Sequence, residues 1–297
     1  MQNIIIIGAG TMGNGIAQVF AIHNFRVSLV DISQPSLDKA IQTIAANCDR
    51  MIAKNSLTAE QKTIALANIK TYTQLSDCAA DADLLVEAAT ENVALKLQLF
   101  QLADQLCPAH CILASNTSSI SITKIAAATA RPHKVIGMHF MNPVPVMKLV
   151  EIIRGYATDG ATTQAIMDLS ARLQKSPVEV NDYSGFVANR ILMPMINEAI
   201  ITLYEGVAGV TEIDTVMRLG MAHPMGPLQL ADFIGLDVCL AILQVLYDGL
   251  GNTKYAPCPL LVNMVMAGRL GQKSGEGFYK YQKASKELVL ADRFARK

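Results

Sequence analysis

A histidine and a glutamate near the middle of the chain could together move a proton. His139 lies at the end of one apolar run, and Glu151 lies inside a second run twelve residues later. Both runs have the length and composition of strands, and the prolines between them exclude a continuous helix. If the strands lie side by side, Glu151 can orient the imidazole and stabilise its protonated form. The alternative is a buried, hydrogen-bonded histidine beside an unrelated carboxylate.

A glycine-rich turn near the N-terminus is the second pattern with a chemical meaning. It reads Gly8-Ala9-Gly10-Thr11-Met12-Gly13 and joins a run of four isoleucines to a helical pattern. Gly8 permits a tight turn, Gly10 lets backbone approach a pyrophosphate, and Gly13 lets helix pack closely on strand. Asp31 ends the next strand, where an acid can bind the adenosine ribose and repels a 2′-phosphate. The pattern predicts an NAD site, with NADP disfavoured.

The elements that must position these residues alternate between strand and helix over the first half of the chain. Further strands are expected at 68–72, 82–89 and 111–116, with a helix at 93–106. Such alternation predicts an α/β fold with a parallel, doubly wound Rossmann-type sheet and with ligands at the carboxyl ends of its strands. Glu91, Lys96 and the segment Ser115–Ser119 fall at such ends.

The pattern changes near residue 184. From there to residue 276 strand signals are almost absent, and apolar residues recur at three- and four-residue spacing, which is typical of helices. Thr211 and Asp214 resemble a capping box, and the segment 237–250 is apolar nearly all round, which favours a core or a subunit contact. We predict an NAD-binding Rossmann domain at 1–184 and a mostly α-helical substrate and dimerisation domain at 185–297.

Composition narrows the function classes. Of 297 residues 51% are hydrophobic and 17% charged, and 25 Lys and Arg balance 25 Asp and Glu. We therefore expect no nucleic-acid or membrane partner, and the apolar excess favours a homodimer. The segment Cys107–Cys111 could suggest a metal knuckle, but two further ligands have no evident source, so no metal site is expected. Reduced thiols and a strand-like N-terminus favour a cytoplasmic protein.

Several segments together resemble the L-3-hydroxyacyl-CoA dehydrogenase family over nearly the whole chain. They are GAGTMG at 8–13, EAATEN at 87–92, ASNTSS at 114–119, GMHFMNPVPVMKLVEIIRG at 137–155, GFVANR at 185–190, HPMGP at 223–227 and GQKSGEGFY at 271–279. The resemblance implies an NAD-dependent enzyme that interconverts short 3-hydroxyacyl-CoA and 3-ketoacyl-CoA thioesters. An acyl-CoA thioester is thus the implied substrate.

The resemblance also implies roles for matched residues. His139 would be the catalytic acid/base, and Glu151 would orient it. Ser118 and Asn189 would be catalytic residues that bind the reacting oxygen of the substrate, and Lys54 would contact the CoA phosphates. Cofactor contacts are implied for Gly8, Gly10, Thr11, Met12, Gly13, Asp31, Glu91, Lys96, Asn142 and Lys273.

Plainer interpretations of the same residues stay open. The hydroxyl groups between Ser115 and Ser119 can cap a helix that begins near Ile120. Asn189 can be an ordinary residue at a helix N-terminus, and Lys54 can be a solvated lysine. For the whole chain, the alternatives are a related dehydrogenase of a free hydroxy acid and a non-catalytic dinucleotide-binding protein. Ser184 also stands where the family usually has proline.

Overall fold

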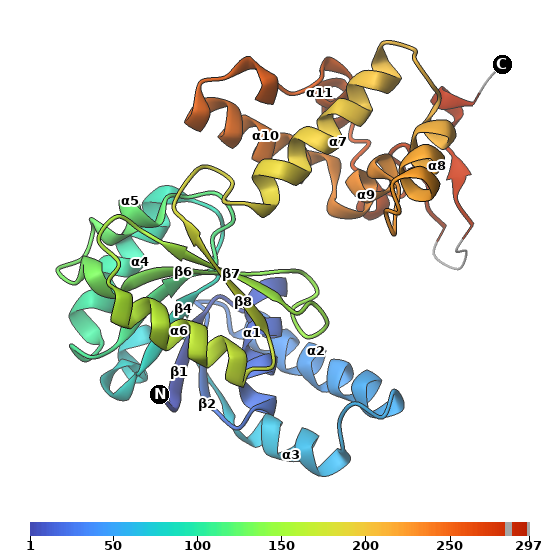
Figure 1. The fold of residues 1–297 in the computed structure, drawn as a ribbon. Helices are drawn as coiled ribbons and strands as arrows, with labels where there is room; N and C mark the ends of the chain where they lie inside the picture. Colours follow the sequence, from blue (N-terminus) through green and yellow to red (C-terminus); the bar gives the residue numbers. More distant parts are fainter. Residues whose placement is uncertain (283–286, 296–297) are drawn as a thin grey trace. The chain divides into compact units, whose positions relative to one another are not determined.

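The computed structural model describes residues 1–282 and 287–295 (Figure 1). The chain divides into two compact units, Met1–Tyr183 and Ser184–Lys297. The first combines a sheet with flanking helices, and the second is mostly helical. The predicted α/β class with a helical C-terminal part is therefore confirmed.

The first unit is built on an eight-stranded sheet in the order β3-β2-β1-β4-β5-β6-β7-β8. The strands are β1 (Asn3–Ile7), β2 (Arg26–Val30), β3 (Ile69–Tyr72), β4 (Leu84–Glu87), β5 (Ile112–Ser115), β6 (Val135–Phe140), β7 (Leu149–Arg154) and β8 (Ser176–Asn181). The helices are α1 (Thr11–Ile22), α2 (Gln34–Ala53), α3 (Ala59–Ala67), α4 (Val93–Leu106), α5 (Ile122–Ala126) and α6 (Gly160–Arg172). From β1 the chain adds β2 and β3 on one side of the sheet and then β4, β5 and β6 on the other. The topological switch point therefore lies at the carboxyl ends of β1 and β4.

The sheet is mixed rather than wholly parallel. Strands β1 to β6 are parallel, β7 runs antiparallel to β6, and β8 is parallel to β7. The expectation of an all-parallel sheet was therefore wrong at its far edge. Only residues 141–148 connect β6 to β7, and a parallel crossover needs a dozen or more residues, so the chain turns back instead.

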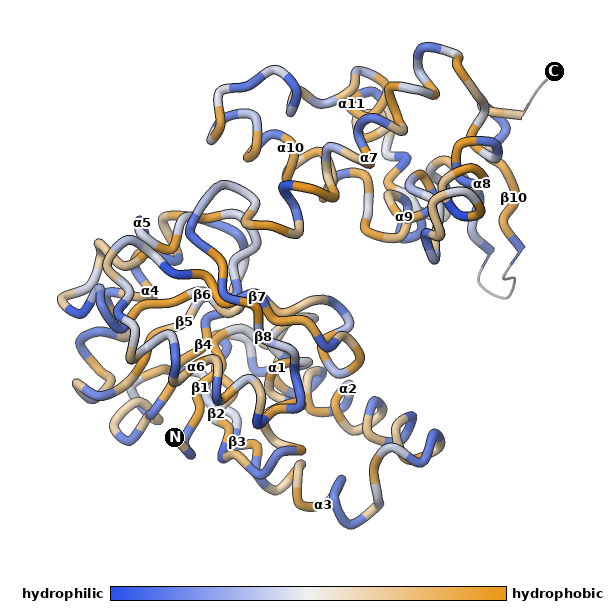
Figure 2. The backbone as a smooth tube through the Cα atoms, viewed as in Figure 1, coloured by the Kyte–Doolittle hydropathy of each residue, from blue (hydrophilic) through white to orange (hydrophobic). Residues whose placement is uncertain are grey.

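Local sequence explains how the helices of the first unit begin and pack. Helix α2 buries Leu37, Ala40, Ile44 and Cys48 at three- and four-residue spacing, and Figure 2 shows the matching alternation of hydrophobic and hydrophilic segments along it. Helix α3 begins after its N-cap Thr58, whose side chain accepts a hydrogen bond from the Gln61 backbone N–H. The strands of the sheet supply the core between the helices.

The second unit packs its helices around a separate core. They are α7 (Ala188–Tyr204), α8 (Val210–Gly220), α9 (Pro227–Ile234), α10 (Leu236–Leu250) and α11 (Pro259–Met266), with the short strands β9 (Tyr279–Lys280) and β10 (Val289–Leu290). Among the described residues, no single helix has the length and hydropathy of a membrane span. Helices α9 and α10 reach that threshold only as a pair, which is bent by 97°.

The capping box expected at Thr211 and Asp214 is wrong. Helix α8 begins at Val210, and Gly209 rather than Thr211 occupies its N-cap. Asp214 instead accepts hydrogen bonds from the backbone N–H groups of Leu228 and Gln229, in the first turn of α9. Its carboxylate therefore serves a helix that the local pattern did not point to.

Candidate active site

His139 and Glu151 meet across the β6–β7 pair. They occupy directly opposed positions in the antiparallel register, and His139 Nδ1 lies 2.8 Å from Glu151 Oε2. His139 is 8% exposed and Glu151 is 3% exposed, so water screens this contact weakly. Because an ionised carboxylate only accepts hydrogen bonds, Nδ1 carries a proton and Nε2 is left as the ring nitrogen that can exchange one.

The turn after β5 brings a polar segment to the same part of the sheet. Asn116 Oδ1 accepts a hydrogen bond from the Phe140 backbone N–H at 2.9 Å. This bond ties the turn that carries Ser118 to the residue immediately after His139. The role of Asn116 was not anticipated from the sequence, because the bond joins residues 24 positions apart.

Glu91 holds this turn in place. Its Oε1 accepts hydrogen bonds from the Thr117 hydroxyl, the Ser119 hydroxyl and the Ser118 backbone N–H. Burial would raise the pKa of Glu91, but the Lys96 ammonium and the bonds from the turn outweigh burial and lower it. Glu91 is therefore a fixed anion beside the Ser118 turn.

The hydroxyl groups of residues 115–119 do not cap the helix that follows. Helix α5 begins at Ile122, and Ser121 is its N-cap. The Asp182 carboxylate also accepts hydrogen bonds from the Ile122 and Thr123 backbone N–H groups. The helix start expected near Ile120 was therefore placed too early.

A buried ion pair lies behind Glu91. Lys96 is 1% exposed, and its Nζ lies 2.7 Å from Glu87 Oε1 and 3.2 Å from Glu91 Oε2. Glu87 is fully buried and also accepts hydrogen bonds from the Ser115 hydroxyl and the Ala89 backbone N–H, each at 2.7 Å. The sequence pattern drew attention to Lys96 but not to Glu87.

The glycine turn has the shape that a dinucleotide requires. Gly8 has φ +102°, and a Cβ there would lie 2.6 Å from the Ala88 carbonyl oxygen. A Cβ on Gly13 would overlap the Gly8 carbonyl oxygen, whereas a Cβ on Gly10 would meet open space. The turn is thus closed toward the sheet and open where α1 begins, so backbone N–H groups at that helix start can reach a pyrophosphate.

Asp31 is fastened to this turn. Its Oδ2 accepts a hydrogen bond from the Ala9 backbone N–H at 2.8 Å, and its Oδ1 accepts one from Ser33 at 2.9 Å. The carboxylate therefore stands at the end of β2, beside the glycine turn, where the adenosine half of a dinucleotide is bound in this fold.

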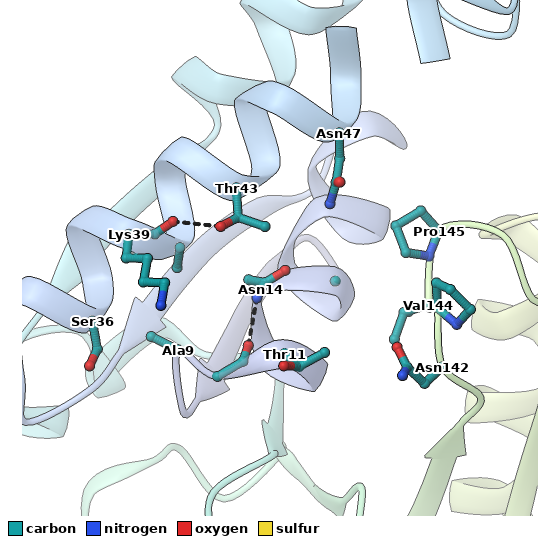
Figure 3. A pocket seen from close by; sticks show the side chains of 14 residues that line it. Ala9, Thr11, Asn14, Ser36, Lys39, Thr43, Asn47, Asn142, Val144 and Pro145 are labelled. Atoms are coloured by element: carbon teal, nitrogen blue, oxygen red, sulfur yellow. Dashed lines mark hydrogen bonds between the residues drawn. The ribbon is translucent and has the colours of Figure 1, made fainter. Parts of the chain in front are cut away.

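A pocket of about 450 Å³ opens next to the glycine turn (Figure 3). Thr43 and Asn47 of α2 line one side, and Asn142 and Val144 of the β6–β7 connection line the other. Thr11, at the start of α1, also borders it. The pocket is polar along α2 and apolar at Val144, which suits an extended ligand with both kinds of surface.

Lys54 and Met12 of the first unit do not line this pocket. Lys54 is the exposed C-cap of α2, and Met12 is half-buried against the core. Asn189 and Lys273 belong to the second unit. There Asn189 is 9% exposed in the first turn of α7, and Lys273 Nζ lies 2.6 Å from an Asp237 oxygen.

Known proteins share both the sequence and the fold. The family model described as "3-hydroxyacyl-CoA dehydrogenase, NAD binding domain" matches residues 3–183, and the corresponding C-terminal domain model matches residues 185–281. The 3-hydroxybutyryl-CoA dehydrogenase of Bradyrhizobium diazoefficiens is 52% identical over 284 residues, which cover 96% of this chain and 97% of that protein. The mitochondrial hydroxyacyl-coenzyme A dehydrogenase of Rattus norvegicus is 41% identical, with 95% and 92% covered.

A solved structure agrees with these relatives. The crystal structure of (S)-3-hydroxybutyryl-CoA dehydrogenase PaaH1 from Ralstonia eutropha has a TM-score of 0.92 and 50% sequence identity, and the match covers 95% of this chain and all of that one. Two family models that together span most of the sequence, and relatives of nearly equal length, agree on one assignment. The chain belongs to the 3-hydroxyacyl-CoA dehydrogenase family, whose members are NAD-dependent oxidoreductases.

Proposed function

We propose that the protein interconverts (S)-3-hydroxybutyryl-CoA, or a similarly short 3-hydroxyacyl-CoA, with the corresponding 3-ketoacyl-CoA. The observation that carries this proposal is the 2.8 Å contact between His139 and Glu151 on the same sheet as the glycine turn. The relatives that are about half identical are named for this substrate. When bound, NAD⁺ would accept the hydride in the oxidation and NADH would donate it in the reduction.

His139 moves the proton that accompanies hydride transfer. With Nδ1–H donated to Glu151, Nε2 can take the proton of the 3-hydroxyl group as its carbon is oxidised, and it can return the proton in the reverse direction. Glu151 keeps the ring oriented and stabilises the imidazolium that forms. Ser118 and Asn189 are neutral donors suited to the substrate oxygen, which becomes more negative during reduction.

The CoA moiety has a suitable surface along α2. Asn47 borders the pocket, and Lys54 follows it by seven residues, or two helical turns on the same face, about 10 Å along the axis. Arg50 lies between them and donates a hydrogen bond to Asn47. We propose that these polar and cationic side chains meet the CoA phosphates.

The second unit is proposed to form a homodimer. A second pocket of about 370 Å³ on α7 and α8 is lined by Met195, Val207 and Val216, of which Val207 is 72% exposed and Val216 is 60% exposed. Such exposed apolar residues are typical of subunit contacts. Light scattering on the wild type and on Val216→Glu tests this proposal, since a dimer at this surface would be weakened by the charge. The six free cysteines suit a reducing compartment such as the cytoplasm.

The decisive experiment follows NADH oxidation with acetoacetyl-CoA, beside NADPH and beside free acetoacetate. Turnover with NADH and the thioester alone supports the proposal. Turnover with free acetoacetate would indicate a dehydrogenase of free acids, and absence of turnover in a protein that still binds NADH would indicate a non-catalytic dinucleotide-binding protein.

A further inference from the structure

Glu87 is a fully buried carboxylate for which the reaction described above has no use. It ends β4, one residue before Ala88, whose carbonyl oxygen packs against Gly8. Each of its hydrogen-bond partners lies on a segment that shapes the site. They are Lys96 on α4, Ser115 at the end of β5 and the Ala89 backbone N–H beyond β4.

Lys96 is shared between Glu87 and Glu91. The two carboxylates and one ammonium carry a formal charge of −1, and Lys96 and Glu87 are both shielded from solvent. A buried charge is tolerated only when its partners hold it closely, and removal of Glu87 would leave Lys96 with Glu91 and the more distant Ala89 carbonyl oxygen. Glu91 would then be drawn toward Lys96 at the expense of its bonds to the Ser118 turn.

The place of this charge follows from the sheet. Asp31 marks the adenosine side at the end of β2, so the other half of the dinucleotide must extend past Gly8 toward the ends of β4 and β5. Glu91 and the Ser118 turn stand at those ends. The nicotinamide ring carries a positive charge only when oxidised, and a nearby net negative charge therefore distinguishes NAD⁺ from NADH.

We propose that Glu87 is a positioning residue that acts through Lys96 and Ser115. It holds Glu91 and the Ser118 turn in place, and it supplies the excess negative charge that favours NAD⁺ over NADH. This inference rests on the proposed function, because it requires the nicotinamide half of the cofactor at the ends of β4 and β5.

The first test is Glu87→Gln, which keeps the volume of the side chain and removes its charge. We expect the dissociation constant for NAD⁺ to rise about tenfold relative to that for NADH, the effect of one unit charge over roughly 10 Å at an effective dielectric constant near 20. Calorimetric titration with each cofactor measures the ratio without turnover. We also expect turnover with acetoacetyl-CoA to fall, because Ser118 loses its fixed position.

The double variant Glu87→Gln, Lys96→Met separates charge from position and covers the case in which the single variant does not fold. It leaves no unpaired ammonium and returns the formal charge to −1, carried by Glu91. The NAD⁺-to-NADH ratio should return toward the wild-type value while turnover stays low. A double variant with wild-type turnover would overturn the positioning role, and one whose ratio stays tenfold shifted would overturn the charge role.

Asp104→Asn is the matched control. Asp104 lies on α4, the helix that carries Lys96, and it is paired with Arg131 instead of Lys96. Its loss should leave the cofactor ratio unchanged, and a shift equal to that of Glu87→Gln would overturn the inference. A folded Glu87→Gln variant with an unaltered ratio would do the same. If instead the wild type fails to oxidise NADH with acetoacetyl-CoA, the proposed function itself is wrong.

Discussion

Both units bury carboxylates, but they give them different partners. In the first unit the buried Glu151 is bonded to His139, and the buried Glu87 shares Lys96 with the more exposed Glu91. Glu87 also has neutral donors, but each of these buried carboxylates has one side-chain partner that carries a charge or can exchange a proton. In the first unit, a buried carboxylate therefore lies beside a side chain that can carry a charge or transfer a proton during a reaction.

The buried carboxylates of the second unit face fixed donors. Asp232 accepts hydrogen bonds from the Phe278 and Tyr279 backbone N–H groups and from the Tyr281 hydroxyl. Asp214 accepts bonds from the first turn of α9 and from the Tyr279 hydroxyl. Burial raises the pKa of Asp232 to about 6, because these neutral donors compensate only part of the lost hydration.

This difference in hydrogen-bond partners separates buried carboxylates that can take part in a reaction from those that only stabilise the fold. Backbone N–H groups hold their protons, and burial raises the pKa of the Tyr279 and Tyr281 hydroxyls, so these too stay protonated. Asp232 therefore fastens the segment around Tyr279 to α9, and Asp214 fastens α8 to α9 and to Tyr279. A histidine or lysine partner holds its carboxylate equally well and keeps a proton or a charge available. The type of partner, rather than the depth of burial, distinguishes the two regions.

The largest expected effect is at His139. We expect His139→Gln to lower kcat about 10²- to 10⁴-fold, the range of a positioned acid/base, while the dissociation constant for NADH stays near the wild-type value. Steady-state kinetics with acetoacetyl-CoA and a fluorescence titration with NADH measure the two quantities. Wild-type turnover in this variant would show that the buried His139–Glu151 pair has no catalytic role.

Asp232 tests the structural side. Its pKa is raised in the folded protein from an ordinary value of 3.8 to about 6, so the protonated form is favoured by the fold. Its contribution to the free energy of unfolding is present below about pH 4 and is lost as pH rises through about 6, by on the order of 3 kcal/mol. Urea unfolding of the wild type and Asp232→Asn across this range should give a difference that follows this course. A difference that is constant with pH would contradict it.

Asp31 sharpens the comparison, because it is a carboxylate of the first unit whose partners are backbone N–H groups. If it reads the ribose of the cofactor, Asp31→Ala should narrow the preference for NADH over NADPH about tenfold, since an ionic repulsion of that order is removed. The ratio of kcat/KM for the two cofactors measures it. An unchanged ratio together with lower stability would place Asp31 with Asp232 as a structural carboxylate.

The smallest effect concerns an exposed charge. Lys54 at the end of α2 is accessible to solvent, so a contact with a CoA phosphate is screened. Lys54→Ala should raise KM for acetoacetyl-CoA by roughly two- to fivefold at low salt, with kcat unchanged. The effect should shrink as salt is added. Lys70→Ala, on β3, is the control and should leave KM unchanged.

Much of the first unit could be predicted because its signals are local. The bounds of α4 agree with the predicted helix 93–106. The direction of β7 was not predicted, although the sequence contains a signal for it. The connection at 141–148 is too short for a helical crossover, which excludes a parallel β6–β7 pair. The apolar runs of β6 and β7 indicate burial on both faces and not the direction of either strand.

Contacts between distant residues explain the remaining failures. Glu87 is nine residues from Lys96 and 28 from Ser115, and no periodic pattern joins a strand end to two separate elements. Asp214 reaches Tyr279 across 65 residues, so a local capping box was the nearer but incorrect explanation. Such partners are decided by how whole elements pack.

The register of β6 and β7 makes catalytic competence at this hairpin an all-or-none property. His139 and Glu151 are directly opposed, and their neighbours Met138 and Ile152 are fully buried in the core on the other face. A slip of one residue would exchange the faces, so that His139 and Glu151 would point into the core and the apolar side chains would take their place. Substitutions in this core are therefore tolerated until the register fails, and activity should then disappear abruptly rather than drift.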